Sequence, residues 1–263
     1  MKQTKSSRIM IAAFLVLPII HLLVFSYVPI ISNVILSFTN YRGTGTPRFI
    51  GLSNYKRLLT DPQYTLLFKN CLWYMLVAIP QLVFAFALSI FVNGKFRGLG
   101  LFKGILIIPY LLNGVIVSTI FIIFFNNSGT LNTILNSIGL GALTHQWLQD
   151  LKLVNPAIAS ISIWRYFGQN FIMFFGALQT VPAIKNVLFI NILLSISGSI
   201  QVFEIPYIMM NGSNGTTTPV IQIQQSAFAD NRLGFAAALS ILVFVVVVIS
   251  VGLQSIFNKK AED

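Results

Sequence analysis

The most unusual polar side chains of this sequence lie within residues 163–182, a stretch that is otherwise apolar enough to sit in a bilayer. The first half of the stretch carries a cation, a phenol and two amides: Arg165, Tyr166, Gln169 and Asn170. A charge or an amide at membrane depth is costly unless it faces a partner, a cavity or water, so such side chains mark candidate functional positions. Their chemistry is hydrogen bonding rather than bond breaking.

Most of these groups share one helical face. The positions i, i+3, i+4 and i+7 are occupied by Ser162, Arg165, Tyr166 and Gln169. Residues at this spacing lie above one another on an α-helix. A polar stripe on a membrane helix predicts a lined path for a polar solute, which is the first indication of a transport protein.

A second stripe is predicted around Glu204, an acidic residue well inside an apolar segment. Ser197, Gln201 and Glu204 lie at i, i+4 and i+7, so on one helix they would face the same way. Two roles are open for Glu204, a structural ion pair with Arg165 and a place in the wall of a cavity. The two roles are compatible.

Small polar residues surround this second stripe. Asn191, Ser195 and Ser199 fall on a neighbouring face of the same predicted helix. Serine often serves close helix packing, so contact between helices is the simpler interpretation of the serines. Gly198 fits either close packing or the open wall of a cavity.

Enzyme motifs are largely absent. There is no G-x-x-x-x-G-K-[ST] loop with which the chain could hold ATP, no H-E-x-x-H and no G-x-S-x-G. Cys71 is a single cysteine in an apolar run, expected to act as a small hydrophobe. His21 and His145 are far apart in sequence, the first expected to be packed or interfacial and the second solvated. No catalytic or metal site is predicted.

The composition is that of a membrane protein. Of 263 residues, 56% are hydrophobic and 9% are charged, against about 25% charged in a soluble domain. The net charge of +11 does not indicate nucleic-acid binding, because the basic residues sit in short segments between apolar runs rather than in one patch. We therefore expect membrane lipid and no nucleic acid around the chain.

Six segments are long enough to span a hydrocarbon core that needs about 20 residues each. They predict one all-α transmembrane permease domain over residues 1–263, with spans at 9–36, 66–92, 101–125, 155–181, 187–210 and 234–257. Pro80, Pro109 and Pro206 are expected to kink three of the spans. Lys and Arg are denser at the two termini and in the 93–103 turn, which predicts cytoplasmic N- and C-termini in a multi-pass plasma-membrane protein.

Six stretches resemble, in order, the permease subunits of ABC sugar importers of the maltose and oligosaccharide type. They read FIGLSNYKRLLTDPQY, NGKFRGLGLFKGILIIPYLLNGVIVSTIF, SGTLNTILNSIGL, SIWRYFGQNFIMFFGALQTVP, SISGSIQVFEIPYIMMNG and LGFAAALS. Together they cover nearly the whole chain. The match is best to the first of the two permease partners, the maltose-permease-F-like one, and it implies a type I ABC importer permease fold.

The resemblance also implies partners and a site. It implies a homologous second permease, two ATPase subunits that use ATP and Mg²⁺, an extracytoplasmic solute-binding protein and a sugar substrate moved by alternating access. No cofactor is expected on this chain itself. Sugar contacts in such permeases come from the fourth and fifth core helices, which here gives Ser162, Arg165, Tyr166, Gln169, Gly198, Ser199 and Glu204.

One departure from the family concerns the cytoplasmic coupling loop. In such permeases the GLQxxP ending leads into a loop with an EAA…G pattern that docks on the ATPase. Here GALQTVP is followed at once by AIKNVLF, so roughly two dozen residues, a helix–turn–helix length, have no counterpart near 182–186. Either the intact subunit carries a further segment at this point or the loop is truly absent.

Other functions remain open on the sequence. A chain without a coupling loop could be an uncoupled membrane scaffold, and composition alone also allows a secondary transporter of small polar solutes. A membrane enzyme is disfavoured, because no nucleophile–base pair or metal-ligand pattern is found.

Overall fold

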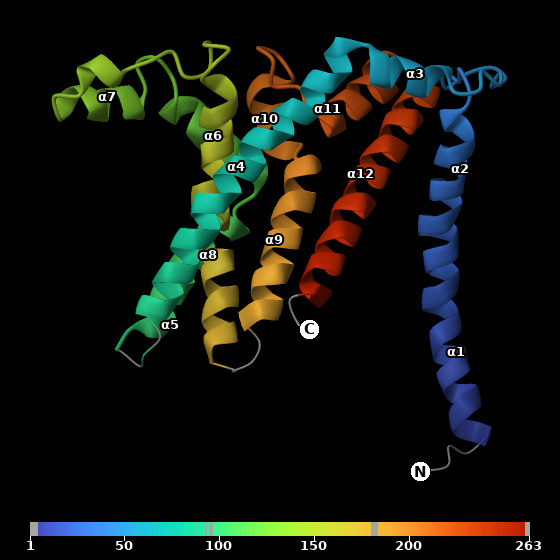
Figure 1. Cartoon of the computed structure of the whole chain (residues 1–263), viewed down its shortest axis with the longest axis horizontal. Helices are drawn as coiled ribbons and strands as arrows, with labels where there is room; N and C mark the ends of the chain where they lie inside the picture. The colour runs from blue at the N-terminus through green and yellow to red at the C-terminus, as the bar shows by residue number, and fades with distance from the viewer. Residues whose placement is uncertain (1–4, 93, 95–96, 180–183, 261–263) are drawn as a thin grey trace. The chain divides into compact units, whose positions relative to one another are not determined.

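The computed structural model describes residues 5–92, 94, 97–179 and 184–260, and within these ranges its regular elements are helices (Figure 1). Thr39 and Phe49 add an isolated antiparallel bridge. The chain divides into two compact units. One comprises Met1–Thr60 with Ile223–Leu242, and the other comprises Asp61–Gln222 with Val243–Asp263.

The first unit begins with one continuous apolar rod. Its segments are α1 (Lys5–Leu22), the π-helical turn η1 (Leu23–Tyr27) and α2 (Val28–Ser37). The π turn lies just before Pro29, whose nitrogen cannot donate the usual helical hydrogen bond. The Val28 amide donates to the Leu23 carbonyl, and the helix continues.

The rest of the first unit consists of α3 (Ser53–Thr60), η3 (Gln225–Ala229) and the start of α12 (Leu233–Lys260). The Asn54 side chain donates to the carbonyls of Ser37 and Thr39, both at 2.9 Å. A Cβ at Gly234 would overlap the Thr39 carbonyl oxygen. The glycine therefore allows α12 to start against the backbone of Thr39.

The second unit is built around α8 (Val154–Leu178). It packs against α4 (Pro62–Phe91), α5 (Leu99–Leu111) and α9 (Ile184–Ile200), which lie alongside it in Figure 1. Asp61 caps α4 by accepting from the Gln63 amide at 3.1 Å, the helix start that the Asp–Pro pair predicts. Fully buried Phe171 and Phe174 fill the core on the inner face of α8.

Smaller elements complete this unit. They are α6 (Gly114–Phe124), α7 (Thr130–Ser137), the 3₁₀ turn η2 (Gly141–Leu143), α10 (Glu204–Met210) and α11 (Pro219–Gln224), whose last two residues reach past the boundary between the units.

The prediction that residues 101–125 form one continuous span is wrong. The helix ends at Leu111, Leu112 is extended, and α6 starts at Gly114 with a bend of 89° between the two helices. The Asn113 side chain accepts from the Val115 amide at 2.8 Å and so caps α6. An Asn–Gly pair inside an apolar run is thus a helix stop and restart.

The predicted span 187–210 is also interrupted, at Gln201–Phe203. Pro206 has no amide hydrogen to offer the carbonyl of Val202, four residues earlier. The Thr218 hydroxyl donates to that carbonyl instead, at 2.7 Å. Ser197, Gln201 and Glu204 therefore do not form a stripe on one continuous helix, because α9 ends at Ile200.

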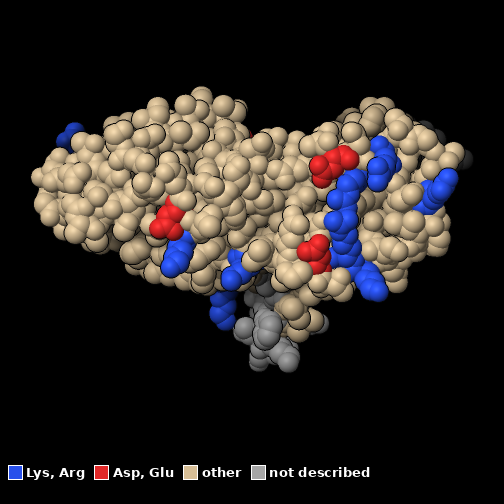
Figure 2. Space-filling model, turned by 90° about the horizontal axis from the view of Figure 1, so that it is seen from above, with Lys and Arg blue, Asp and Glu red and all other residues tan. Residues whose placement is uncertain are grey.

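Within the described residues, four stretches are long and apolar enough to cross a membrane, or five if the bent pair α5–α6 counts as one span. The four are Ala13–Ser37, Pro62–Phe91, Lys185–Met210 and Leu233–Leu253. The polar residues that mark α8 lower its hydropathy, so the predicted span 155–181 is not among them. The expected joint at 182–186 lies partly outside the described residues. Figure 2 shows one face of the molecule, and most of it carries no charged side chain.

Candidate functional site

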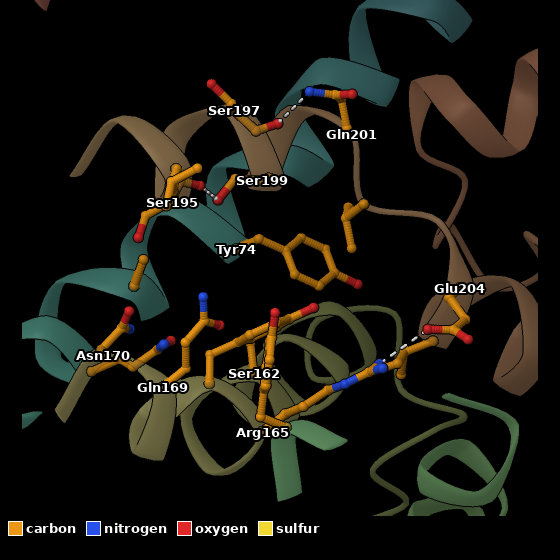
Figure 3. Close-up of a pocket in the computed structure, with 18 of the residues that line it drawn as sticks. Tyr74, Ser162, Arg165, Gln169, Asn170, Ser195, Ser197, Ser199, Gln201 and Glu204 are labelled. Carbon is orange, nitrogen blue, oxygen red and sulfur yellow. Dashed lines mark hydrogen bonds and ion pairs between the residues drawn. The ribbon is translucent and has the colours of Figure 1, made fainter. Parts of the chain in front are cut away.

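The second unit contains a cavity of about 610 Å³ between α8, α9 and the start of α10, with α4 along one side (Figure 3). This volume lies within the roughly 300–1,000 Å³ of small-molecule sites. All seven residues predicted from the sequence line it: Ser162, Arg165, Tyr166, Gln169, Gly198, Ser199 and Glu204. The structure therefore brings together side chains that are up to about 40 positions apart in the chain.

The α8 wall is held in place by the other faces of the same helix. Ala157 and Ile161 are buried on the side of the hydrophobic core. A Cβ at Gly168 would overlap the Leu106 carbonyl, so the backbones of α8 and α5 touch at this point. Packing on both sides leaves the polar stripe of α8 as the face that borders the cavity, as Figure 3 shows for Ser162 and Gln169.

Arg165 forms the predicted ion pair with Glu204. Its Nη1 lies 3.1 Å from Glu204 Oε2, and its Nη2 donates to the Leu112 carbonyl at 3.4 Å. The Arg165 side chain is 11% exposed and that of Glu204 is 47% exposed. Arg165 thus connects the break between α5 and α6 with the break between α9 and α10.

Glu204 occupies a position that suits an anion. It lies in the first turn of α10, and a Cβ at Gly114 would overlap its carboxylate, so it also borders the first residue of α6. The N-terminal end of a helix carries partial positive charge. Two helix starts and Arg165 therefore surround this carboxylate.

The α9 wall presents its small polar residues in two ways. Ser199 is buried and donates to the Ser195 carbonyl at 2.7 Å, in line with a packing role, while Ser195 also borders the cavity. Gln201 donates to the Ser197 carbonyl at 3.2 Å from beyond the end of the helix. No atom lies within 4 Å of a Cβ built on Gly198, so the glycine forms an open part of the wall.

Three polar cavity residues were not singled out from the sequence: Tyr74, Gln81 and Tyr110. Tyr74 and Gln81 are seven positions apart, and this helical spacing on α4 was the available signal. The Tyr74 hydroxyl is buried and has no hydrogen-bond partner among the described residues, and the same holds for Arg165 Nε. These two orphaned groups belong to the cavity wall.

The cysteine and the two histidines considered in the sequence lie outside the cavity. Cys71 is buried in α4, as expected of a small hydrophobe. His21 packs on Phe25 with ring centroids 4.7 Å apart, and His145 meets Trp147 edge-on at 5.3 Å. None of the three lines the cavity.

Comparison with known proteins finds no matching family model, but it finds relatives along nearly the whole chain. The probable ABC transporter permease protein YurN of Bacillus subtilis is 26% identical over 94% of this chain and 95% of its own. The arabinooligosaccharides permease AraP of the same species is 29% identical over 88% and 82%. The multiple sugar-binding transport system permease MsmF of Streptococcus mutans is 24% identical over 95% of each chain.

The alignments with relatives are longer than this chain. The one with YurN extends over 277 residues and the one with MsmF over 281, against 263 residues here. These relatives therefore possess residues that have no counterpart in this sequence.

Solved structures support the fold. A chain of a bacterial alginate ABC transporter, crystallised with an alginate-bound periplasmic protein, superimposes with a TM-score of 0.81 at 20% identity, over 96% of this chain and 94% of that one. A second alginate importer structure gives a TM-score of 0.70 at 21% identity. The permease relatives and this fold show a multi-pass membrane protein that is similar to permease subunits of ABC transporters, among them sugar permeases, which are transport components rather than enzymes.

Proposed function

We propose that the chain carries a sugar or oligosaccharide across the membrane and that the cavity of the second unit holds the sugar on its way. The observation that carries the proposal is the meeting of all seven predicted residues in one cavity of ligand size. The relatives named for arabinooligosaccharides and multiple sugars agree with this substrate class.

The cavity offers the groups that a sugar requires. Sugars present many hydroxyl groups and weakly polar C–H faces, so their sites combine convergent polar groups with apolar and aromatic walls. Gln169 and Asn170 supply amides. Tyr166 and Tyr110, whose ring centroids are 6.0 Å apart, supply aromatic faces on the same wall.

Transport requires partners that this chain does not contain. We propose a homologous second permease, two ATPase subunits that hydrolyse ATP with Mg²⁺, and an extracytoplasmic solute-binding protein that delivers the sugar. In this assembly α8 also crosses the membrane, and α5–α6 crosses it as one broken span. The chain then has six spans, with both termini in the cytoplasm. Alternating access follows from movement of the two permeases against each other.

The missing coupling loop favours a second candidate, an uncoupled membrane scaffold. The short connection after GALQTVP and the longer relatives both support it. Co-purification of ATPase subunits with sugar-stimulated ATP hydrolysis excludes the scaffold. Uptake that persists without ATP indicates a secondary transporter instead.

The test is uptake of labelled oligosaccharides by the complete transporter in proteoliposomes. We expect Arg165→Ala, Tyr166→Ala and Glu204→Ala to reduce ATP-driven uptake at least several-fold without preventing assembly. Gln63→Ala, an exposed position in the first turn of α4, is the control and should transport normally. Unchanged uptake and sugar selectivity in all three cavity variants would remove the site.

A further inference from the structure

We propose that the cavity selects neutral sugars over anionic ones, and that Glu204 sets this selectivity by neutralising Arg165. The inference rests on the proposed function, because it names the class of sugar that the same cavity accepts. Four observations carry it: the charges of the wall, the donors of Arg165, the placement of Glu204 and the unpaired groups nearby.

The charges of the cavity wall balance. Among the described residues that line it, Arg165 and Glu204 carry the charges, and the others are neutral polar or apolar. Their side chains meet at 3.1 Å, as the dashed line in Figure 3 marks. A solute therefore meets no net positive charge, although the wall contains an arginine.

The guanidinium of Arg165 is already engaged. Nη1 donates to Glu204 and Nη2 to the Leu112 carbonyl. Arginine recognises a carboxylate or phosphate best when two of its nitrogens bind the anion side by side. An anionic sugar must therefore compete with Glu204 and this carbonyl for the guanidinium.

Glu204 does not leave this position easily. The starts of α6 and α10 both favour a negative charge there, in addition to the ion pair. Nearly half of the side chain remains exposed, so the carboxylate also repels an incoming anion. Glu204 thus binds the guanidinium of Arg165 and also disfavours the binding of another anion there.

The unpaired groups fit a neutral ligand. The hydroxyl of Tyr74 and the Nε of Arg165 are buried without a hydrogen-bond partner in the described part of the chain. A buried polar group without a partner is unfavourable. Both atoms are shielded from the cavity in this conformation, so the hydroxyl oxygens of a neutral sugar would accept from them after a small movement of the wall, without disturbing the ion pair.

The test measures sugar binding to the complete transporter in lipid nanodiscs, without the solute-binding protein, so that the specificity of that protein does not enter. The probes are labelled maltotriose, cellotriose and galactotriose. Each is paired with its derivative in which a 6-hydroxymethyl group is oxidised to a carboxylate. Equilibrium dialysis at fixed salt gives a ratio of neutral to anionic affinity for each pair.

We expect the wild-type transporter to bind the neutral member of each pair roughly tenfold or more tightly than the anionic member. The anionic member forms no charged hydrogen bond with Arg165 while Glu204 occupies it, and such a bond is worth about 1.5–3 kcal/mol. Glu204→Gln frees Arg165 and should lower the ratio by roughly tenfold. The double variant Arg165→Gln with Glu204→Gln removes both charges and should restore a preference for neutral sugars. The exposed charge control Asp230→Asn should keep the wild-type ratio.

Two results overturn the inference and are distinguishable. Equal binding of both members by the wild-type transporter rejects charge selectivity while the sugar site stands, and this result does not depend on any variant folding. A Glu204→Gln complex that assembles but keeps the wild-type ratio rejects the role of Glu204. Binding of no sugar of either class rejects the proposed function itself.

Discussion

At the scale of single residues, Tyr74 shows how a ligand site can differ from a packed core. It is 7% exposed, yet its hydroxyl lacks a hydrogen-bond partner among the described residues. A tyrosine chosen for packing alone could be a phenylalanine at this position. An orphaned hydroxyl in a cavity wall indicates a group kept for a ligand.

The substitution Tyr74→Phe tests this interpretation. We expect no loss of thermal stability in the purified complex, because no protein hydrogen bond disappears, and a decrease of sugar affinity of several-fold. Tyr55→Phe is the matched control. The Tyr55 hydroxyl donates to Ser37 Oγ at 2.7 Å, so its removal should cost about 1 kcal/mol of stability and leave sugar binding unchanged. The opposite pattern would assign Tyr74 to the core.

At the scale of elements, the position of the site depends on close approaches between helices. Gly168 allows α8 to lie directly on the backbone of α5 at Leu106, whereas Gly176 on the same helix has open space where a Cβ would be. The two glycines therefore offer a comparison within one helix.

Gly168→Ala should separate α8 from α5 and destabilise the subunit by about 1–3 kcal/mol, the usual cost of overpacking. Gly176→Ala should be neutral or slightly stabilising, because alanine favours helix. Thermal unfolding of both purified complexes, followed by sugar binding, measures the difference. Equal stability of the two variants would contradict the contact between α8 and α5.

The break between α9 and α10 depends on a side chain from a distant segment. Thr218 donates to the Val202 carbonyl, which Pro206 leaves without its helical partner. Thr218→Val should leave the Val202 carbonyl without a hydrogen bond and lower the free energy of unfolding by about 1–3 kcal/mol. It should also weaken sugar binding, because Glu204 is the first residue of α10. Thr218→Ser keeps the hydroxyl and should preserve both properties. Unfolding curves of the two variants decide between a required hydrogen bond and a dispensable one.

At the scale of the whole molecule, the coupling to ATP is the open structural question. A permease without a cytoplasmic loop between its fourth and fifth predicted spans would have little surface for an ATPase to hold. Mass spectrometry of the intact subunit answers it. We expect a mass above 29.2 kDa by roughly two dozen residues, a helix–turn–helix length. A mass that agrees with 29.2 kDa shows that the loop is absent and favours the scaffold.

The sequence by itself determined the membrane class and the α8 stripe, because hydropathy and helical periodicity are local properties of the chain. It offered the pairing of Arg165 with Glu204 as one of two roles, and the structure shows that pair. Only the tertiary structure decided where the predicted spans 101–125 and 187–210 break. It also decided that Tyr74 joins the wall and that Arg165 reaches the Leu112 carbonyl. The break near Val202 and the reach of Arg165 depend on partners far away in sequence, Thr218 and Leu112, and no pattern within one segment reveals them.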